Sequence, residues 1–596
     1  DKLKTLRSSA LQVEFTGSAF QGQAAKPAAI PPELLGFIAA LIILGLVFRT
    51  AGAVALPLAS AAAALTIGLG LIGLLTHVMN VSNVTPQLSQ LMVIGVGVDY
   101  ALFIVTRHRR NLLHGIGVKE SIAIAVDTSG RAVLFAGATV CVAILGLCAL
   151  GVSFLYGVAI GTSIAVALTM VASLSLLPAV LSLLGYRVLP RKLRASVKDG
   201  TYVHDEHRTR WAWWSEVVAA NKLVLGVIAA GLIAVLAIPF FSMRLGQSDQ
   251  GTDPTGSTTR TGYNLIADAK GFGPGYTSVL ELVIHGPGAN DPAYLKHVSA
   301  SLADVGPAGN VNPASIAAAP VGKELALVSF KSISSPQDAK TSALVKNLRN
   351  NLAQQLEAGT PNHVYVFGQT AVFVDFAAVL SSKMPLFFVA VIGLSFLLLM
   401  IAFRSVLVPL SAAVMNLFAA GASFGVMVVL FQWGWFSNLL GTGGSGPIDA
   451  FLPVLFFAIL FGLSMDYQVF LVSRMHEEWI HTGDNRRSIR VGQAETGGII
   501  TAAALIMISV FGGFAIADAR VIKELGLGLG AAIFIDAFIL RTVLVPALMH
   551  ALGKANWYFP KWLDKITPRV SVESADADWI DQDGDKPAPE KNLARA

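Results

Sequence analysis

Long apolar runs dominate this chain and limit the folds that it can adopt. Of its 596 residues, 54% are hydrophobic and only 13% are charged, which excludes an ordinary soluble globular protein. A helix needs about 20 apolar residues to cross a hydrocarbon core of about 30 Å. We therefore predict a polytopic α-helical membrane protein with eleven spans, at approximately residues 33–49, 53–77, 88–107, 131–151, 156–184, 222–242, 384–403, 406–431, 451–474, 499–517 and 524–550.

Basic residues predict the orientation of these spans, because Lys and Arg concentrate in cytoplasmic loops. Three basic clusters follow the third, fifth and ninth spans, and the alternation of spans places all three on one side. Only Arg520 and Lys523, in a predicted short outer loop, go against the rule. These loops account for much of the net charge of +6, so nucleic acid is not a predicted partner. The clusters are Arg107, Arg109, Arg110 and Lys119; Arg187, Arg191, Lys192 and Arg194; and Arg474, Arg486, Arg487 and Arg490.

The same alternation places residues 243–383 outside the membrane as one polar insertion. Strand-like patterns near Val279–His285, Leu325–Phe330 and His363–Phe367 alternate with helical patterns at Asp291–Val305 and Pro336–Ala358. This order predicts an extracytoplasmic α+β porter domain of the split βαβ type.

The two membrane halves repeat one another. Gly95–Arg107 and Gly462–Arg474 have matching sequences, with Asp99 and Asp466 lying 367 residues apart. We expect a two-fold pseudo-repeat whose parallel halves face each other across an axis normal to the membrane. Further pairs at nearly the same offset are Arg107 and Arg474, Ser121 and Ser488, and Pro178 and Pro546.

The repeat also suggests that the chain begins inside a first extracytoplasmic domain. Val13–Gly17 resembles Val364–Gly368, and Leu3–Arg7 resembles Val345–Arg349. We expect a complete protein to have twelve spans, of which eleven are present, and two such domains. The predicted organisation is a tail of the truncated first domain (1–32), the first membrane repeat of five helices (33–186), a basic cytoplasmic linker (187–221), the first helix of the second repeat (222–242), the second extracytoplasmic domain (243–383), the five remaining helices (384–552) and a largely disordered cytoplasmic tail (553–596).

Asp99 with Tyr100 and Asp466 with Tyr467 are the strongest candidates for chemistry. A carboxylate at the centre of a membrane helix costs roughly 2.5–3.5 kcal/mol on insertion scales, a cost that is usually tolerated for function. A phenol can hydrogen-bond such a carboxylate. We predict that these four residues form a proton relay; the alternative is a pair of static contacts that hold the halves together.

Other residues in the spans receive secondary predictions. Asp536 and Arg541 lie five positions apart in the last span and are not expected to share a helix face. Asp536 is a possible member of the proton path, whereas Arg541 is expected to snorkel or pair near the cytoplasmic edge. The small residues near the aspartates are predicted to serve helix packing; they are Gly95, Gly97, Gly462 and Ser464.

No motif points to an enzyme, an ATP motor, a cofactor or a metal site. The chain has no G-x-x-x-x-G-K-[ST] phosphate loop, no H-E-x-x-H, no paired CxxC and no G-x-S-x-G. Cys141 and Cys148 are too far apart along one predicted helix for a disulfide. An ion gradient is therefore the expected energy source.

The stretches Gly95–Arg107, Phe461–Arg474 and Asp536–Pro546 resemble the mycobacterial membrane protein large (MMPL) family of the resistance-nodulation-division (RND) superfamily. The resemblance implies proton-driven export of lipids or other hydrophobic compounds across the bacterial inner membrane. It also implies crossed pairing of Asp99 with Tyr467 and of Asp466 with Tyr100. Gln468 stands where many members carry Glu.

Several readings of function remain open at this point. The partners expected are protons, the lipid bilayer and a lipid or hydrophobic small-molecule substrate, and the working unit is a monomer or a homo-oligomer such as a trimer. An exporter of drugs or small solutes shares every feature above. A lipid-sensing relative that does not pump, or a proton-driven accessory to protein translocation, belongs to a different class.

Overall fold

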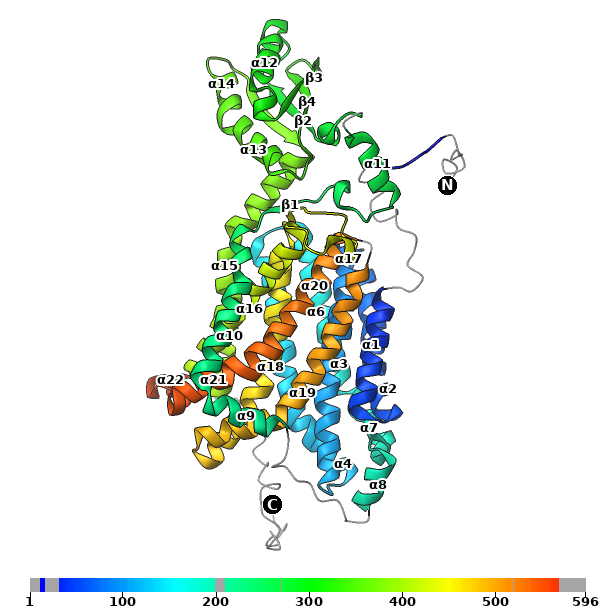
Figure 1. Ribbon diagram of the computed structural model, residues 1–596, viewed down its shortest axis with the longest axis vertical. Helices are drawn as coiled ribbons and strands as arrows, with labels where there is room; N and C mark the ends of the chain where they lie inside the picture. The colour runs from blue at the N-terminus through cyan, green and yellow to red at the C-terminus, as the bar shows by residue number, and fades with distance from the viewer. Residues whose placement is uncertain (1–10, 17–31, 199–209, 269–270, 518, 568–596) are drawn as a thin grey trace.

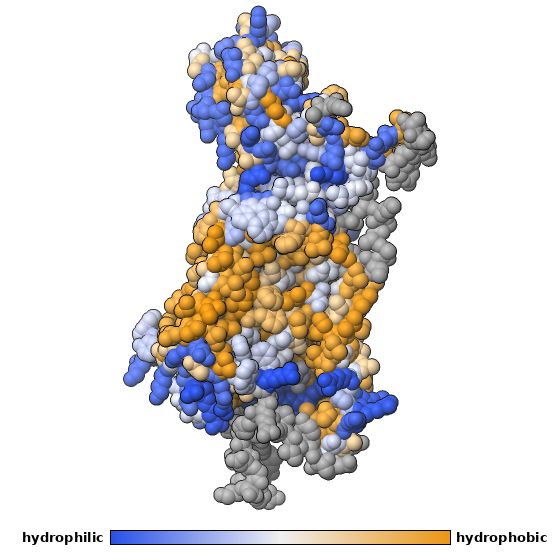
Figure 2. Space-filling view, in the orientation of Figure 1, coloured by the Kyte–Doolittle hydropathy of each residue, from blue (hydrophilic) through white to orange (hydrophobic). Residues whose placement is uncertain are grey.

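The computed structural model describes residues 11–16, 32–198, 210–268, 271–517 and 519–567. A helix bundle carries a small α+β region at one end, which we call the domain end, and Figure 1 shows this region projecting above the bundle. We call the opposite end the distal end. Figure 2 shows a hydrophobic band around the middle of the bundle, with hydrophilic residues on both sides. Such a band is expected of a bundle that spans a membrane.

Within the described residues, ten helical segments are long and apolar enough to cross a membrane, which confirms the polytopic class. The one remaining predicted span, the first (33–49), corresponds to α1 (Pro32–Phe48), which has 17 described residues. At 1.5 Å per residue these extend about 25 Å, less than a hydrocarbon core of about 30 Å. The ten segments are Ala51–Leu75, Val84–Leu113, Val118–Leu150, Ser153–Val188, Lys222–Ser242, Gln369–Phe403, Leu407–Gln432, Leu452–Thr482, Asn485–Ile516 and Arg520–Trp557.

Several segments are built from consecutive helical elements. The first half contains α2 (Ala51–Leu75), α3 (Val84–Leu113), α4 (Val118–Ala125), α5 (Arg131–Leu145), α6 (Ser153–Leu174), α7 (Leu176–Leu184) and α8 (Arg191–Lys198). The second half contains α9 (Arg210–Ala220), α10 (Lys222–Ala237), α15 (Gln369–Phe403), α16 (Leu407–Met427), α17 (Ser437–Leu440), α18 (Leu452–Thr482), α19 (Asn485–Gly513), α20 (Arg520–Phe534), the π-helix η14 (Ile535–Leu544), α21 (Val545–Leu552) and α22 (Lys561–Ile566).

The helix boundaries follow the repeat found in the sequence. Shifted by 367 residues, α3 would cover 451–480, and α18 covers Leu452–Thr482. These two helices are the most buried of the bundle. The helix α18 packs against α5 and α19, while α3 packs against α2, α6 and α19. The two repeat-related helices therefore form the centre, and elements of both halves surround each of them.

The α+β region has one four-stranded sheet in the order β3-β4-β2-β5, with all neighbours antiparallel. Its strands are β2 (Val279–His285), β3 (Val311–Pro320), β4 (Leu325–Ser332) and β5 (His363–Gly368). The connection from β2 to β3 contains α12 (Pro292–Val305), and that from β4 to β5 contains α13 (Ala339–Asn347) and α14 (Ala353–Glu357). This is the predicted split βαβ arrangement; β3 was missed in the sequence.

Alternation explains the core of this region. Along β2, Leu280, Leu282 and Ile284 are buried while the residues between them are not, because successive side chains of a strand point to opposite faces. Val298 and Leu302 of α12 and Leu344 of α13 pack in the same core. The helix α11 (Thr258–Ala267) precedes the sheet in the chain.

Two connections hold the α+β region on the bundle. The helix α15 starts directly after β5 and continues as a span (Figure 1). Arg349 of the region pairs with Asp375 on this helix, with 2.8 Å between Nη2 and Oδ2. The short strand β1 (Leu245–Gly246) pairs in parallel with β6 (Ile448–Asp449), which immediately precedes α18. A displacement of α18 can therefore reach the α+β region.

Some predictions concern residues that lie largely outside the described ranges. Of the predicted first-domain tail, the structure describes residues 11–16 and Pro32; of the basic linker, residues 199–209 are not described, and of the C-terminal tail residues 568–596 are not described.

Candidate functional site

The four predicted relay residues meet at the centre of the bundle. Asp99 is 4% and Asp466 2% exposed, and Tyr100 and Tyr467 are equally buried. Asp99 lies within interaction distance of the Tyr467 hydroxyl, and Asp466 within that of Tyr100. Each aspartate thus faces the tyrosine of the other half, which is the crossed arrangement that the family resemblance implied.

Two stacked rings lie beside these residues. Phe103 on α3 and Phe470 on α18 occupy positions 367 residues apart and stack with ring centroids 3.5 Å apart and 8° between their planes. The two repeat-related helices α3 and α18 are therefore in side-chain contact at these rings.

Hydrogen bonding at this centre is incomplete in the described structure. One carboxylate oxygen of Asp99, one of Asp466 and the Tyr100 hydroxyl have no hydrogen-bond partner. The Tyr467 hydroxyl donates to the Met507 sulfur at 2.9 Å, a weak acceptor. An unpaired polar group away from water costs about 1–3 kcal/mol. These three groups therefore carry an uncompensated cost of burial in the described structure.

Small residues next to the aspartates allow close helix contacts, as predicted for membrane helices. A Cβ on Gly97 would lie 2.9 Å from Thr169 Cγ2, and one on Gly462 would lie 3.0 Å from the Val140 Cα. A Cβ on Gly95 would meet only ordinary contacts at 3.5 Å. A side chain therefore does not fit at Gly97 or Gly462. At Gly95 there is room for a Cβ.

Asp536 and Arg541 form a buried ion pair, which corrects the expectation that they lie on different helix faces. Arg541 Nη2 lies 3.1 Å from Asp536 Oδ1. Both residues belong to the π-helix η14, in which hydrogen bonds run from residue i to i+5, so residues five apart do lie on one face. Arg541 is 1% exposed and therefore does not snorkel.

Arg541 also connects the pair to α18 and α16. Its Nη2 donates to the Ser464 carbonyl at 2.7 Å and to the Ser464 hydroxyl at 2.8 Å, and its Nη1 contacts the amide oxygen of Gln468. The Ser464 hydroxyl donates to Asn416 Oδ1 at 2.6 Å. Ser464 therefore does more than pack. Asn416 was missed in the sequence, where its only signal is an amide inside an apolar span.

Three charged residues, Arg110, Arg474 and Glu495, form ion pairs on the distal side of the centre, and we call them the distal clamp. Arg110 on α3 holds Glu495 of α19 through two contacts, 2.7 Å from Nη1 to Oε2 and 3.0 Å from Nη2 to Oε1. Arg474 on α18 donates to the same carboxylate, with 2.9 Å from Nη2 to Oε1. One carboxylate thus joins the repeat-related helices. The first half carries Thr128 at the corresponding position, so the clamp is not repeated.

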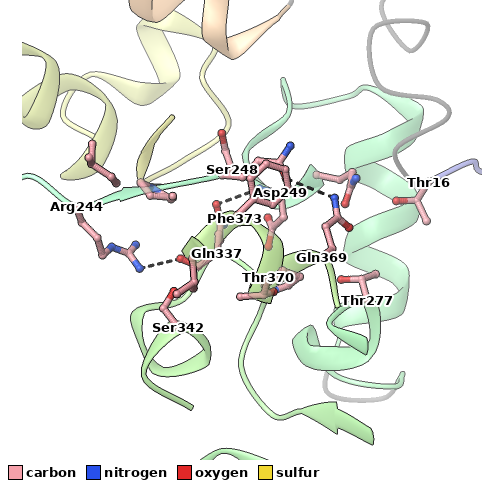
Figure 3. Close-up of a pocket in the computed structure, with 17 residues that line it drawn as sticks. Thr16, Arg244, Ser248, Asp249, Thr277, Gln337, Ser342, Gln369, Thr370 and Phe373 are labelled. Carbon is pink, nitrogen blue, oxygen red and sulfur yellow. Dashed lines mark hydrogen bonds between the residues drawn. The ribbon is translucent and has the colours of Figure 1, made fainter. Parts of the chain in front are cut away.

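A cavity of about 310 Å³ lies where the α+β region meets the bundle (Figure 3). Arg244 Nη1 donates to the Gln337 carbonyl at 2.8 Å, and the Asp249 amide donates to Gln337 Oε1 at 3.3 Å. The hydroxyls of Thr16 and Thr277, which also line the cavity, have no hydrogen-bond partner. Polar and apolar groups line the cavity in about equal measure, and Phe373 and Val374 are among the apolar ones.

In the described ranges, no group of three or more His, Cys, Asp or Glu could hold a metal ion, and Cys141 and Cys148 are free.

Comparison with known proteins agrees with this architecture. The sequence matches the profile of the MMPL family over residues 3–223 and 296–575. It is 36% identical over 577 residues to membrane protein YdfJ of Bacillus subtilis, covering 96% of this chain and 77% of that protein. It is 34% identical over 544 residues to the mycolic acid-containing lipids exporter MmpL11 of Mycolicibacterium smegmatis, covering 89% of this chain but 56% of that exporter. The chain therefore spans little more than half of the second relative.

The fold also resembles a solved structure. The crystal structure of SecDF, a translocon-associated membrane protein from Thermus thermophilus, superposes with a TM-score of 0.50 at 14% identity, covering 87% of this chain and 62% of that one. At this identity the likeness concerns the fold alone.

Proposed function

The chain belongs to the MMPL family of bacterial multi-pass membrane transporters and is not an enzyme, and we propose that it uses a proton gradient to export a lipid or another hydrophobic or amphiphilic compound. The observation that carries the proposal is the crossed arrangement of Asp99 with Tyr467 and Asp466 with Tyr100. Asp99, Asp466 and Tyr100 each have a buried polar atom without a hydrogen-bond partner in the described structure, and such groups in the most buried helices are a costly way to hold two helices together.

In the proposed mechanism, protons bind at Asp99 and Asp466 from one side and leave to the other. Protonation removes a buried charge and changes the packing of α3 against α18 at the stacked Phe103 and Phe470 rings. The movement passes from α18 to β6, which pairs with β1, and so reaches the α+β region. Asp536 and Arg541 are proposed to hold α18 in register through Ser464.

The cargo class follows from a relative and from the membrane setting. MmpL11 of M. smegmatis is named as an exporter of mycolic acid-containing lipids, and we propose a related amphiphile here. The proposal places α1 as an eleventh span, the domain end outside the inner membrane and the distal end in the cytoplasm, where the three basic clusters are expected. The working unit is proposed to be a monomer or a small homo-oligomer.

Proton-driven movement of labelled lipids in proteoliposomes tests this function. The protein is compared with its Asp99→Asn and Asp466→Asn variants under an imposed pH gradient. Asp127→Asn serves as the matched control, because Asp127 is a half-exposed partner of Arg131. We expect movement in the wild type and the control and its loss in both relay variants, with folding retained.

Other outcomes would identify other functions. Movement of dyes but not lipids would favour the drug or small-solute exporter. Lipid binding without movement would favour a sensor, and persistence of gradient-driven movement in both relay variants would overturn the proton relay.

A further inference from the structure

Four charged side chains are buried together at the domain end of the bundle, away from the relay centre. Arg520, Lys523 and Glu524 belong to the first turns of α20, and Asp449 is the last residue of β6. Their exposed fractions are 8%, 5%, 0% and 5% respectively. The sequence placed Arg520 and Lys523 in a short outer loop against the rule for basic residues. The structure places both residues in α20 and not in a loop, and protein encloses both cations.

The two cations are satisfied by fixed partners. Arg520 donates to Glu524 Oε1 at 2.8 Å, to the Phe431 carbonyl at 2.8 Å and to the Gly444 carbonyl at 3.0 Å. Lys523 donates to the Leu440 carbonyl at 2.6 Å. These contacts fix the segment between α16 and β6 on α20. Arg520 thus binds one carboxylate and two backbone carbonyls at once.

The two acids are not satisfied in the same way. Asp449 Oδ2 and Glu524 Oε2 are buried and have no hydrogen-bond partner. The two carboxylates interact with one another, with Arg520 beside both and Ser248 beside Asp449. Arg520 neutralises the carboxylate that it pairs with, Glu524, while Lys523 is directed to backbone carbonyls. When both acids are ionised, the Arg520 guanidinium therefore faces two carboxylates, of which it pairs directly with Glu524.

We infer that Asp449 and Glu524 form a second proton-binding site, in which one bound proton holds β1 against β6. With the proton bound, the pair carries a single negative charge, which Arg520 offsets. Without it, two buried negative charges repel each other across the contact between β6 and α20. Repulsion displaces Asp449 and loosens the pairing of Gly246 with Asp449.

The site is placed where it can act on the α+β region. Two backbone hydrogen bonds hold β1 on β6, from the Ile448 amide to the Arg244 carbonyl at 3.0 Å and from the Ala450 amide to the Gly246 carbonyl at 3.1 Å. The segment that follows β1 lines the junction cavity, where Figure 3 shows Ser248 and Asp249. The Asp249 side chain accepts a hydrogen bond from the Gly251 amide. Release of β1 therefore changes the wall of this cavity.

Burial raises the pKa of Asp449 to about 7, against the attraction of Arg520. A group with such a pKa exchanges its proton near neutral pH. If the domain end faces outward, as in the proposed function, this pair lies on the outer side of the relay centre. The inference rests on the proposed function only in this last respect, since proton binding and strand pairing are properties of the resting protein.

Hydrogen exchange of the Ile448 and Ala450 amides in the full-length protein tests the inference without any transport. After correction for intrinsic exchange rates, protection of both amides is expected to fall as the pH rises from about 6 to about 8 in the wild type. In Asp449→Asn, which cannot ionise, protection is expected to stay high throughout. Asp291→Asn is the matched control, because Asp291 is an exposed helix cap that Asn replaces well.

Infrared difference spectra between the same two pH values give a second readout. The band of a protonated carboxylic acid is expected in the wild type and in Asp99→Asn, with a reduced amplitude in Asp449→Asn and in Glu524→Gln. Equal protection at both pH values in the wild type, or an unchanged band in both pair variants, would overturn the inference. If Asp99→Asn loses transport but keeps the pH-dependent protection and the carboxylic acid band, both the proton relay and the second proton-binding site are supported. If Asp99→Asn keeps transport, the proton relay fails while the second site is still supported.

Discussion

Arg541 and Asp536 form an ion pair between positions five apart, with 3.1 Å from Nη2 to Oδ1, at the centre of the last span. An α-helix would turn these side chains away from each other, but the π-helix η14 aligns them. Both Asp536 oxygens lack a hydrogen bond of good geometry, so the attraction of Arg541 is the main compensation for burying this charge.

Replacing Arg541 with Met should therefore destabilise the protein strongly. The change leaves the Asp536 carboxylate buried without a cation, for which losses of about 3–5 kcal/mol are typical. Unfolding in detergent micelles measures the loss. Arg131→Met is the control, because Arg131 and Asp127 form a half-exposed pair of a kind worth about 0–1 kcal/mol. Equal losses in the two variants would show that Asp536 is not held by Arg541.

Removing the Tyr100 hydroxyl should separate stability from transport. This buried hydroxyl has no hydrogen-bond partner, so Tyr100→Phe is expected to leave stability unchanged or raise it by up to about 1 kcal/mol. Transport should fall, since Asp466 loses the phenol that faces it. Unfolding and proteoliposome assays on the same preparation measure both. A larger loss of stability than in Tyr467→Phe, whose hydroxyl contacts Met507, would contradict the prediction.

Gly97 and Gly95 should respond differently to the same added methyl group. In Gly97→Ala the new Cβ would lie 2.9 Å from Thr169 Cγ2 and 3.3 Å from Ala61 Cβ, and the β-branched Thr169 has little freedom to move. We expect a loss of about 1–3 kcal/mol from overpacking. Gly95→Ala, with its nearest contact at 3.5 Å, should be nearly neutral. Similar thermal unfolding of the two variants would rule out this packing constraint.

Breaking the distal clamp should make the protein leak protons. Glu495→Gln removes the charge that joins Arg110 on α3 to Arg474 on α18, and the like-charged arginines then repel each other. A stability loss of about 2 kcal/mol is expected, between the values for exposed and buried pairs. Passive proton flux into proteoliposomes, followed with a pH-sensitive dye, measures the leak. Glu216→Gln is the control, since Glu216 pairs with Arg490 in an exposed position. An equal proton flux in Glu495→Gln and Glu216→Gln would show that the ion pairs of Glu495 do not block proton leakage.

Stability should depend on pH through Asp449. Its pKa is raised by burial from 3.8 to about 7, so the folded protein binds the proton more tightly than the unfolded chain does. The stabilisation from this proton is fully present below pH 3.8 and is lost as the pH rises through about 7. Melting temperatures across this range measure the slope. In Asp449→Asn the slope should be reduced, and an identical slope would refute the assignment.

Much of the fold could be predicted from local patterns. The spans, the strands β2, β4 and β5 and the helix α12 follow from hydrophobic periodicity, which depends only on which residues are neighbours in the chain. The strand β3 (Val311–Pro320) was missed because it is mostly exposed and carries two prolines, and so lacks the alternation on which such predictions rest.

The sequence by itself determined that this chain spans a membrane, that its halves repeat, and that Asp99 and Asp466 occupy equivalent places, because composition and spacing suffice for each. Only the tertiary structure decided which charges meet. Arg110 and Glu495 are 385 positions apart, Asp449 joins Glu524 from another element, and the pairing of Asp536 with Arg541 depends on a π-helical hydrogen-bond register. Contacts between distant segments and local helix register depend on how all the helices pack together, and no pattern within one span contains that information.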